Sequence, residues 1–318
     1  MNLDATPPRR IVCLLSSATE MVCALGLGDR LVAVSHDCDY PPEVATKRRV
    51  TTCHIQTAAS SRQIDAQVRQ VSRQGGPLYS LDQQALAACE PDLIVTQKQC
   101  DVCAVGYRDV LTAVEGLETA RPIPVVALNP TSLDAVLADI RLVGCAAGCE
   151  GAADALIDSL SRRIAAVKRR TDRLSAADRP RTVMIEWIDP LILAANWVPE
   201  LLQLAGGACP LVTGGRHSCY TAWKEVREFD PQVILVSPCG FDLDRTVREA
   251  RFLSGLEGWS DVDAVRNGRV LAVDGNAYVN RSGPRLVDTL EIIAHLLHPR
   301  LFPVPPTVSC PADAWCLI

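Results

Sequence analysis

The sequence predicts an α/β protein made of two similar Rossmann-like lobes joined by a long helix. Short apolar runs alternate with stretches of helical periodicity along almost the whole chain, a pattern typical of parallel sheets covered by helices. The same order of signals occurs twice, before and after one unusually long helical pattern. The chain has 318 residues, a length that suits about two domains.

The strand candidates are short, rich in β-branched residues and apolar on both faces, as expected for strands buried between helices. In the first half of the chain they are residues 11–15, 31–34, 93–95 and 124–128. In the second half they are residues 182–186, 233–236 and 269–273.

The two halves also resemble each other weakly in short segments. An acidic residue followed by proline precedes a buried strand at Glu90-Pro91 and again at Asp230-Pro231. Between the halves, a helical pattern with one apolar stripe runs from about residue 152 to residue 174. We therefore expect an N-terminal α/β lobe over residues 1–140, a linking helix region over 141–178, a C-terminal α/β lobe over 179–302 and a proline-rich tail over 303–318.

Composition and charge exclude several classes of function. The formal net charge is −5, so nothing draws the chain toward nucleic acid or an anionic membrane surface. No stretch reaches the roughly 18 consecutive apolar residues that a membrane span needs. The first ten residues, MNLDATPPRR, show no signal-peptide pattern. The sequence predicts a cytoplasmic protein without a membrane span and without a nucleic-acid partner.

The chain contains 14 cysteines, and the loops after the predicted strands hold several of them. In a reducing cytosol, cysteines are buried apolar side chains, metal ligands or reactive thiols. Ligands bind beyond the carboxyl ends of the strands in an open parallel sheet. The loop cysteines are therefore candidate ligands of a metal that the sequence does not identify, although the second close pair of a structural zinc site is missing. They are Cys38, Cys100, Cys103 and Cys239.

Aromatic side chains are concentrated in the second half, where 11 of the 14 lie at or after Trp187. Several of them fall in the loops that follow strands. Large rings at such positions suit a bulky, partly apolar ligand rather than a bare metal ion. The alternative is that these rings cover the edge of the core.

Several segments resemble the cobalamin- and iron-siderophore-binding proteins of ABC importers. Residues 10–20 (RIVCLLSSATE) are similar to the opening of that family, and residues 90–94 (EPDLI) and 259–270 (WSDVDAVRNGRV) to later parts. The resemblance spans about residues 9–302. The loops SHDCDYP, CDVCAV and PCGFD, which begin at Ser35, Cys100 and Pro238, are similar to a subgroup that lacks signal peptides and is usually labelled cobalamin-binding.

The resemblance implies a small-molecule ligand, cobalamin or a related corrinoid, in a cleft between the lobes. It also implies an ABC importer or a corrinoid-handling protein as partner. Because exported members carry a signal and this sequence shows none, it favours intracellular salvage or handover. Matching of the loops assigns ligand contacts to Ser17, Thr19, His36, Tyr40 and Cys100 in the first lobe, and to Trp187, Trp197, Phe241 and Tyr278 in the second.

Two other functions remain open at this point. The loop cysteines could ligate a metal or an iron–sulfur cluster. One of their thiols could instead be the nucleophile of an enzyme that acts on a corrinoid. The sequence lacks a phosphate-binding loop, a dinucleotide fingerprint, a G-x-S-x-G elbow and an H-E-x-x-H motif, and no positioned base can be identified. We therefore favour a binding protein over an enzyme.

Overall fold

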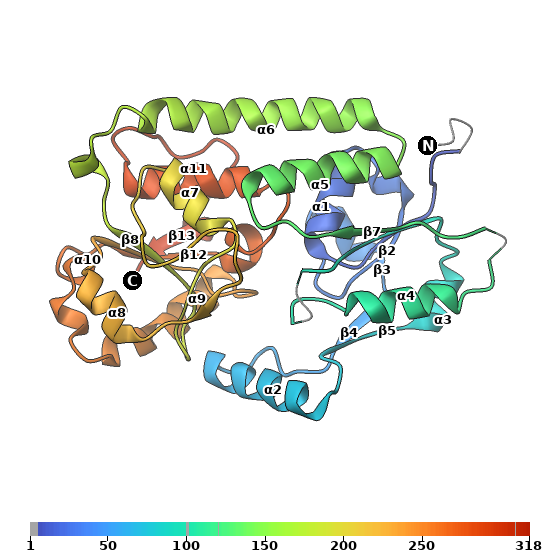
Figure 1. The fold of residues 1–318 in the computed structure, drawn as a ribbon, viewed down its shortest axis with the longest axis horizontal. Helices are drawn as coiled ribbons and strands as arrows, with labels where there is room; N and C mark the ends of the chain where they lie inside the picture. Colours follow the sequence, from blue (N-terminus) through green and yellow to red (C-terminus); the bar gives the residue numbers. More distant parts are fainter. Residues whose placement is uncertain (1–5, 100–101, 120, 309) are drawn as a thin grey trace. The chain divides into compact units, whose positions relative to one another are not determined.

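The computed structural model describes residues 6–99, 102–119, 121–308 and 310–318. Contacts divide the chain into two units, and both are α/β (Figure 1). The first unit comprises Met1–Ala58, Ala66–Pro130 and Asp134–Ser159. The second comprises Ala59–Asp65, Thr131–Leu133 and Leu160–Ile318. The predicted fold class is confirmed.

The first unit is built on a parallel sheet in the order β3-β2-β1-β6-β7. Its strands are β1 (Ile11–Cys13), β2 (Leu31–Val34), β3 (Arg48–Arg49), β6 (Leu93–Gln97) and β7 (Val125–Leu128). A separate antiparallel ribbon pairs β4 (Thr51–Cys53) with β5 (Tyr79–Leu81).

Helices cover both faces of this sheet (Figure 1). Helices α1 (Ser16–Ala24) and α5 (Leu133–Ala146) lie over one face. Helices α3 (Gln83–Ala88) and α4 (Tyr107–Glu115) lie over the other, where Leu86 and Val110 join Val12 and Ile94 in one buried cluster. Helix α2 (Ser61–Gln74) connects the two strands of the ribbon.

The second unit has a mixed sheet in the order β10-β9-β8-β11-β12-β13. Its centre is parallel and consists of β8 (Thr182–Trp187), β11 (Val233–Val236) and β12 (Val270–Val273). Short antiparallel strands flank this centre: β9 (Ile192–Leu193), β10 (Cys219–Tyr220) and β13 (Trp315–Leu317).

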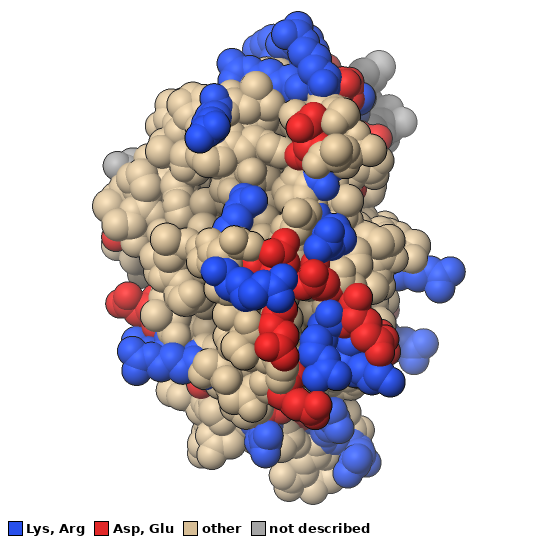
Figure 2. All heavy atoms as spheres, turned by 90° about the vertical axis from the view of Figure 1, so that its left-hand side faces the viewer, with Lys and Arg blue, Asp and Glu red and all other residues tan. Residues whose placement is uncertain are grey.

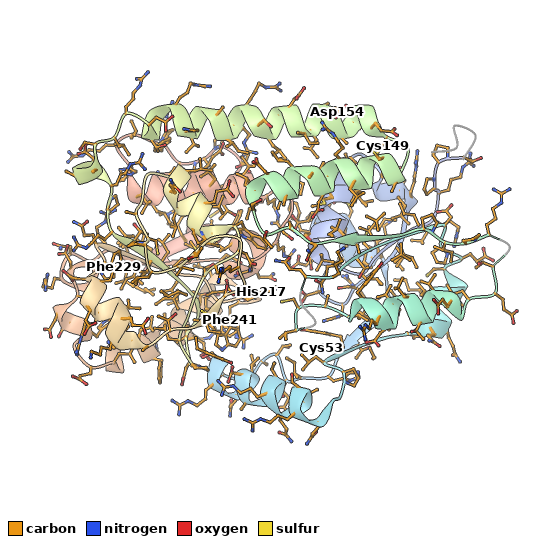
Figure 3. The ribbon with its side chains drawn as sticks, in the orientation of Figure 1. Cys53, Cys149, Asp154, His217, Phe229 and Phe241 are labelled. Atoms are coloured by element: carbon orange, nitrogen blue, oxygen red, sulfur yellow. The ribbon has the colours of Figure 1, made fainter. Side chains whose placement is uncertain are left out.

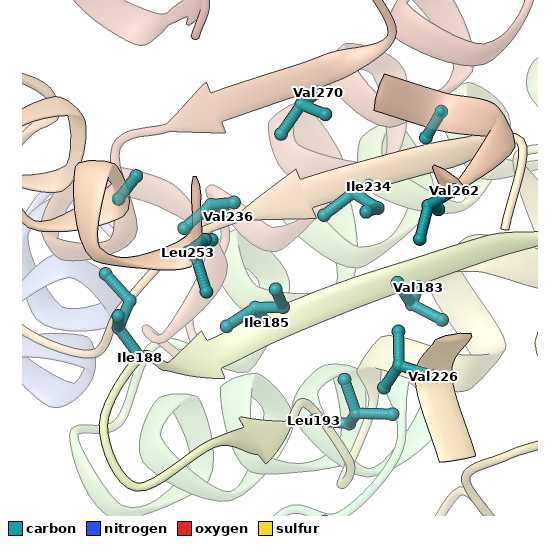
Figure 4. Close-up of a cluster of buried hydrophobic side chains, with 12 residues drawn as sticks. Val183, Ile185, Ile188, Leu193, Val226, Ile234, Val236, Leu253, Val262 and Val270 are labelled. Carbon is teal, nitrogen blue, oxygen red and sulfur yellow. The ribbon is translucent and has the colours of Figure 1, made fainter. Parts of the chain in front are cut away.

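A buried apolar cluster fastens the second sheet to helices α8 (Trp223–Phe229), α9 (Leu243–Ala250) and α10 (Asp263–Arg266). Figure 4 shows Ile185, Ile234 and Val270 projecting from three neighbouring strands into this layer. Helices α7 (Val198–Leu204) and α11 (Leu286–Leu297) pack together over the other face. The remaining short helices are η1 (Gly28–Arg30), η2 (Pro42–Thr46), η3 (Ala176–Asp178), η4 (Arg251–Gly255), η5 (Trp259–Asp261), η6 (Gly275–Val279) and α12 (Pro311–Ala314).

The long helix expected near residues 152–174 is α6 (Glu150–Thr171), which begins just after Cys149 (Figure 3). The boundary between the units falls inside α6, after Ser159. Within the second unit, the Arg163 guanidinium of α6 forms ion pairs with Asp288 and Glu291 of α11. Residues 303–318 were expected to form a tail. Part of this segment completes the second sheet instead, because Trp315–Leu317 pairs with β12.

The internal repeat extends to the hydrogen bonds. Glu90 and Asp230 both have left-handed backbones, with φ of 41° and 50°. In the first unit the Nε of Arg10 donates to the carbonyls of Cys89 and Glu90, and in the second the Nε of Arg181 donates to those of Phe229 and Asp230. In each unit an arginine that precedes the first central strand therefore satisfies the carbonyls at the end of a helix, before the next central strand begins.

The charged surface is mixed in sign. On the face drawn in Figure 2, positive and negative side chains are interspersed rather than gathered into a patch of one sign. In the second unit, Arg227 pairs with Glu257 at 3.2 Å and Arg181 with Asp230 at 3.3 Å. Among the residues that the structure describes, no helix is both long and apolar enough to cross a membrane.

Candidate functional site

In the first unit, the start of α1 is locked to the loop that follows β2. The Oγ of Ser16 donates to the carbonyl of Asp37 at 3.1 Å, and the Thr19 hydroxyl and Cys38 thiol are hydrogen-bonded at 3.1 Å. Ser17 and Thr19 are 2% and 0% exposed. The two α1 residues that were predicted to contact the ligand are therefore buried. The hydrogen bond between Thr19 and Cys38 holds the loop after β2 against α1.

His36 is fixed at the same edge by hydrogen bonding and by stacking. Its Nδ1 lies 2.7 Å from the Thr51 hydroxyl, and its ring stacks on Tyr79 with centroids 5.3 Å apart. Burial lowers the pKa of His36, with Asp37 opposing and Arg49 reinforcing that effect. The imidazole is therefore held neutral near pH 7, in the form that can accept a hydrogen bond.

A cavity of about 800 Å³ lies in the first unit; His36 does not line it, but Tyr79, on which the His36 ring stacks, does. It is lined by Tyr79 of β5, by Lys98, which follows β6, and by Tyr107 and Arg108 at the start of α4. The Tyr79 hydroxyl donates to the carbonyl of Val102 at 2.9 Å, so the same side chain also holds the backbone next to Cys103. The volume lies in the range of about 300–1,000 Å³ that is typical of pockets for small organic ligands.

In the second unit, aromatic rings gather at the carboxyl ends of β8 and β11. Trp187 and Phe241 contact each other with centroids 5.3 Å apart at an angle of 59°. The guanidinium of Arg245 lies 3.5 Å from the centroid of the Phe241 ring, and Phe241 is only 1% exposed. Phe241, a predicted ligand contact, is therefore buried, and within this group the half-buried Trp187 ring is the one with surface left for a ligand.

Residues Ala59–Asp65, which include the first turn of α2, pack onto this aromatic group as part of the second unit. The indole Nε1 of Trp187 donates to the Ser61 carbonyl at 3.2 Å, and the Ser61 hydroxyl donates to Glu249 at 3.0 Å. Arg62 pairs with Asp189 at 2.5 Å. This segment therefore covers part of the edge at which Trp187 lies.

Trp197 and Tyr278 have different surroundings. Trp197 is 7% exposed and its Nε1 donates to the Val279 carbonyl at 3.0 Å, so it braces the helical turn η6 from inside. Tyr278 lies within η6, half-buried, 5.8 Å from the Arg285 guanidinium. In the first unit, Tyr40 is 42% exposed. Tyr40, Trp187 and Tyr278 thus offer more surface to a ligand than Trp197 does.

The family model of periplasmic binding proteins matches residues 11–277. The chain belongs to the periplasmic binding protein family. This confirms the family resemblance seen in the sequence.

Members of the periplasmic binding protein family resemble the chain to different extents. An uncharacterized ABC transporter substrate-binding lipoprotein, YvrC of Bacillus subtilis, is 25% identical over 308 residues, which cover 95% of this chain and 84% of that protein. The vitamin B12-binding protein of Vibrio cholerae is 52% identical over 44 residues, which cover 14% of this chain and only 16% of that protein.

Solved structures show the same fold. A periplasmic heme-binding protein from Pseudomonas aeruginosa is 19% identical, with a TM-score of 0.70 and coverage of 95% of this chain and 96% of that one. The periplasmic vitamin B12-binding protein BtuF of Vibrio cholerae is 21% identical, with a TM-score of 0.65 and coverage of 92% and 98%. At these identities the likeness establishes the architecture of this periplasmic binding protein and not its ligand.

The loop cysteines of this periplasmic binding protein do not share one environment. Cys38 is 1% exposed and burial raises the pKa of its thiol, whereas Cys103 and Cys239 are exposed. Cys100 lies outside the described residues. Within the described part of the chain, no three His, Cys, Asp or Glu side chains converge as they would around a metal ion. The cysteine-ligated metal or cluster stays a prediction without structural support.

Three site residues were missed in the sequence. Arg245 follows Phe241 by four residues at the start of α9, a spacing that brings a cation next to a ring and could have been noticed. Tyr79 and Ser61 gave no such signal. Their partners are distant in sequence, as with the 126 residues that separate Ser61 from Trp187, so only the fold brings them together.

Proposed function

We propose that this periplasmic binding protein binds cobalamin or a related corrinoid and delivers it, as the ligand-binding component of ABC-type uptake or of intracellular handover. The observation that carries the proposal is the half-buried ring of Trp187 at the strand ends of the second unit, which the buried Phe241 and the half-buried Arg245 support from behind. A corrin is a large amphipathic ring, so it needs flat apolar surface together with a few polar groups.

Two further observations support the same ligand. The vitamin B12-binding protein of Vibrio cholerae shares 52% identity with this chain over 44 residues. The first unit adds a neutral imidazole, His36, which stacks on Tyr79, and Tyr79 lines a cavity of about 800 Å³. A neutral imidazole is a good ligand for cobalt and other transition metals.

Spectroscopic titration tests the proposal. Cyanocobalamin added to the purified protein is expected to shift the corrin absorption bands at one equivalent and to raise the melting temperature, because a ligand that binds only the native state stabilises it. The absence of both effects would contradict corrinoid binding. Haem or a ferric siderophore that produces both effects when cobalamin does not would assign a different cargo.

A matched pair of variants locates the binding site. We expect Trp187→Ala to weaken cobalamin binding by roughly tenfold or more, as loss of a buried aromatic contact does. Trp223→Ala is the control, because Trp223 packs at a tilt against Trp259 in the helical layer of the second unit. Equal affinities of the two variants would remove Trp187 from the site.

Cellular location and partner belong to this proposal as well. The cytoplasmic location predicted by the sequence and the partner, an ABC importer or a corrinoid-handling protein, can be examined by fractionation of native cells followed by crosslinking. Recovery of the protein outside the cytoplasm would assign it to uptake rather than to handover.

A further inference from the structure

A second cavity, of about 560 Å³, lies in the second unit away from the candidate site. It opens at the amino end of β12, where Gly268 and Arg269 precede the strand, whereas the aromatic group lies beyond the carboxyl ends of β8 and β11. The last turn of α11 and the edge strand β13 contribute its other walls. It is therefore separate from the corrinoid site proposed above.

The walls of this cavity are mainly leucine. Leu271 of β12 and Leu317 of β13 are paired across the sheet, and Leu296 and Leu297 come from the end of α11. Leu317 is 68% exposed and Leu301, at the rim, is 37% exposed. Apolar side chains that line a cavity yet remain in contact with water gain free energy when an aliphatic chain covers them.

The mouth of the cavity is cationic. Arg269 is half-buried, and its guanidinium donates to the carbonyls of Leu296 and Leu297 at 3.2 Å, where the negative end of the α11 dipole lies. Arg300 is exposed at the rim. The ion pairs formed by the described residues include neither Arg269 nor Arg300. Asp178 is the acidic group that acts on the neighbouring His298.

We propose that this cavity binds a medium-chain fatty acid, with the aliphatic chain against the leucines and the carboxylate at Arg269. Arg269 is a fixed donor because two backbone carbonyls hold its guanidinium. A guanidinium without an acidic partner forms strong charge-assisted hydrogen bonds with a carboxylate. The volume of about 560 Å³ can accommodate a ligand of this size.

Calorimetric titration of the full chain with decanoate tests the proposal. We expect one equivalent of decanoate to bind, and decyltrimethylammonium, which has the same chain length and the opposite charge, to bind at least about tenfold more weakly. No heat of binding with decanoate, or equal affinity for the cationic amphiphile, would overturn the assignment.

Variants locate the site. Arg269→Gln is expected to weaken decanoate binding by about tenfold through loss of the charge, while Arg251→Gln, an exposed arginine elsewhere in the second unit, leaves it unchanged. Leu317→Glu places a carboxylate at the cavity and should compete with the ligand, whereas Leu317→Gln should not. This exposed position decides the matter if Arg269→Gln disturbs folding.

The cobalamin titration distinguishes this site from the first one. If the unmodified protein binds cobalamin, Arg269→Gln and Leu317→Glu should bind it with the same affinity. Both positions lie at the opposite ends of the strands from the proposed cobalamin site. Decanoate affinity that is unaffected by both Arg269→Gln and Leu317→Glu would show that the fatty acid binds elsewhere and would overturn the proposal.

Discussion

At the scale of single residues, burial sets the protonation state of groups in both units. The carboxyl of Asp139 in α5 is held against the interior, and one of its oxygens has no hydrogen-bond partner. Burial raises the pKa of Asp139 to about 6, although a backbone hydrogen bond with Asn129 opposes the shift. A carboxyl of this kind is more easily accommodated when it is protonated.

Asp139 gives the protein a pH-dependent stability of definite sign. Its pKa of about 6 in the folded chain exceeds the value of about 3.9 in an unfolded chain. Between these values the native state binds more protons, so the contribution of Asp139 to the free energy of unfolding is present at low pH and is lost as pH rises through about 6. Partial exposure limits this contribution to about 1 kcal/mol.

The variant Asp139→Asn should flatten this dependence. The asparagine amide does not titrate, so the variant lacks this contribution to the pH dependence of stability. Urea unfolding of the variant and of the parent protein between about pH 4.5 and pH 7 measures the difference. The difference in unfolding free energy between the two proteins is expected to change by about 1 kcal/mol over that range. Parallel pH profiles would contradict the account of Asp139.

The cysteines differ in reactivity for the same reason. Burial raises the pKa of the Cys13 and Cys38 thiols, and both side chains are buried, whereas Cys219 and Cys239 are exposed. Since the thiolate is the reactive form, we expect iodoacetamide to modify Cys38 at least roughly tenfold more slowly than Cys239 in the native protein. Peptide mass mapping after timed labelling measures the rates, and denaturant should equalise them. Rapid labelling of Cys38 would revive the nucleophile hypothesis.

At the scale of elements, the loop that carries Phe241 is held by a close backbone approach. The N–H groups of Gly275 and Asn276 both donate to the Phe241 carbonyl at 3.0 Å. A Cβ on Gly275 would lie 2.1 Å from the carbonyl oxygen of Pro238, closer than any real contact. The ends of β11 and β12 can therefore approach as they do only with glycine at this position.

The substitution Gly275→Ala is expected to destabilise the second unit by about 2 kcal/mol, because backbone must move to relieve the contact. The control is Gly255→Ala, where a Cβ would meet no atom within 4 Å, so its effect should stay below about 0.5 kcal/mol. Denaturant unfolding measures both variants. If Gly275→Ala and Gly255→Ala were equally stable, the loops that follow β11 and β12 would not be in tight backbone contact.

The elements also show how far the sequence could be read. Each central strand was predicted, because a buried strand between helices is a short, uniformly apolar run; β6, predicted as residues 93–95, extends to Gln97. The pairs Arg48–Arg49 and Cys219–Tyr220 were missed, since edge strands of two residues have no pattern of their own. The contact in which Ser61 covers Trp187 could not be predicted, because the two residues lie far apart in the sequence and only the tertiary fold brings them together.

At the scale of the whole molecule, a repeated α/β unit accounts for the architecture and for the two edges that carry the candidate residues. The repeat was readable because Glu90-Pro91 and Asp230-Pro231 occupy equivalent turns in the two units. The site was only partly readable. Sequence patterns placed the candidate residues at strand ends, but the packing around Thr19, Trp197 and Phe241 buries these three side chains.

The central claim is that the family fold in this chain carries a corrinoid. A competition titration tests it most directly, with cyanocobalamin, haemin and a ferric hydroxamate siderophore compared on the same preparation of the full chain. The account predicts that cyanocobalamin binds at one equivalent and at least about tenfold more tightly than the other two, a difference of about 1.4 kcal/mol in binding free energy. Tighter binding of haemin or of the siderophore, or no binding of cyanocobalamin, would contradict it.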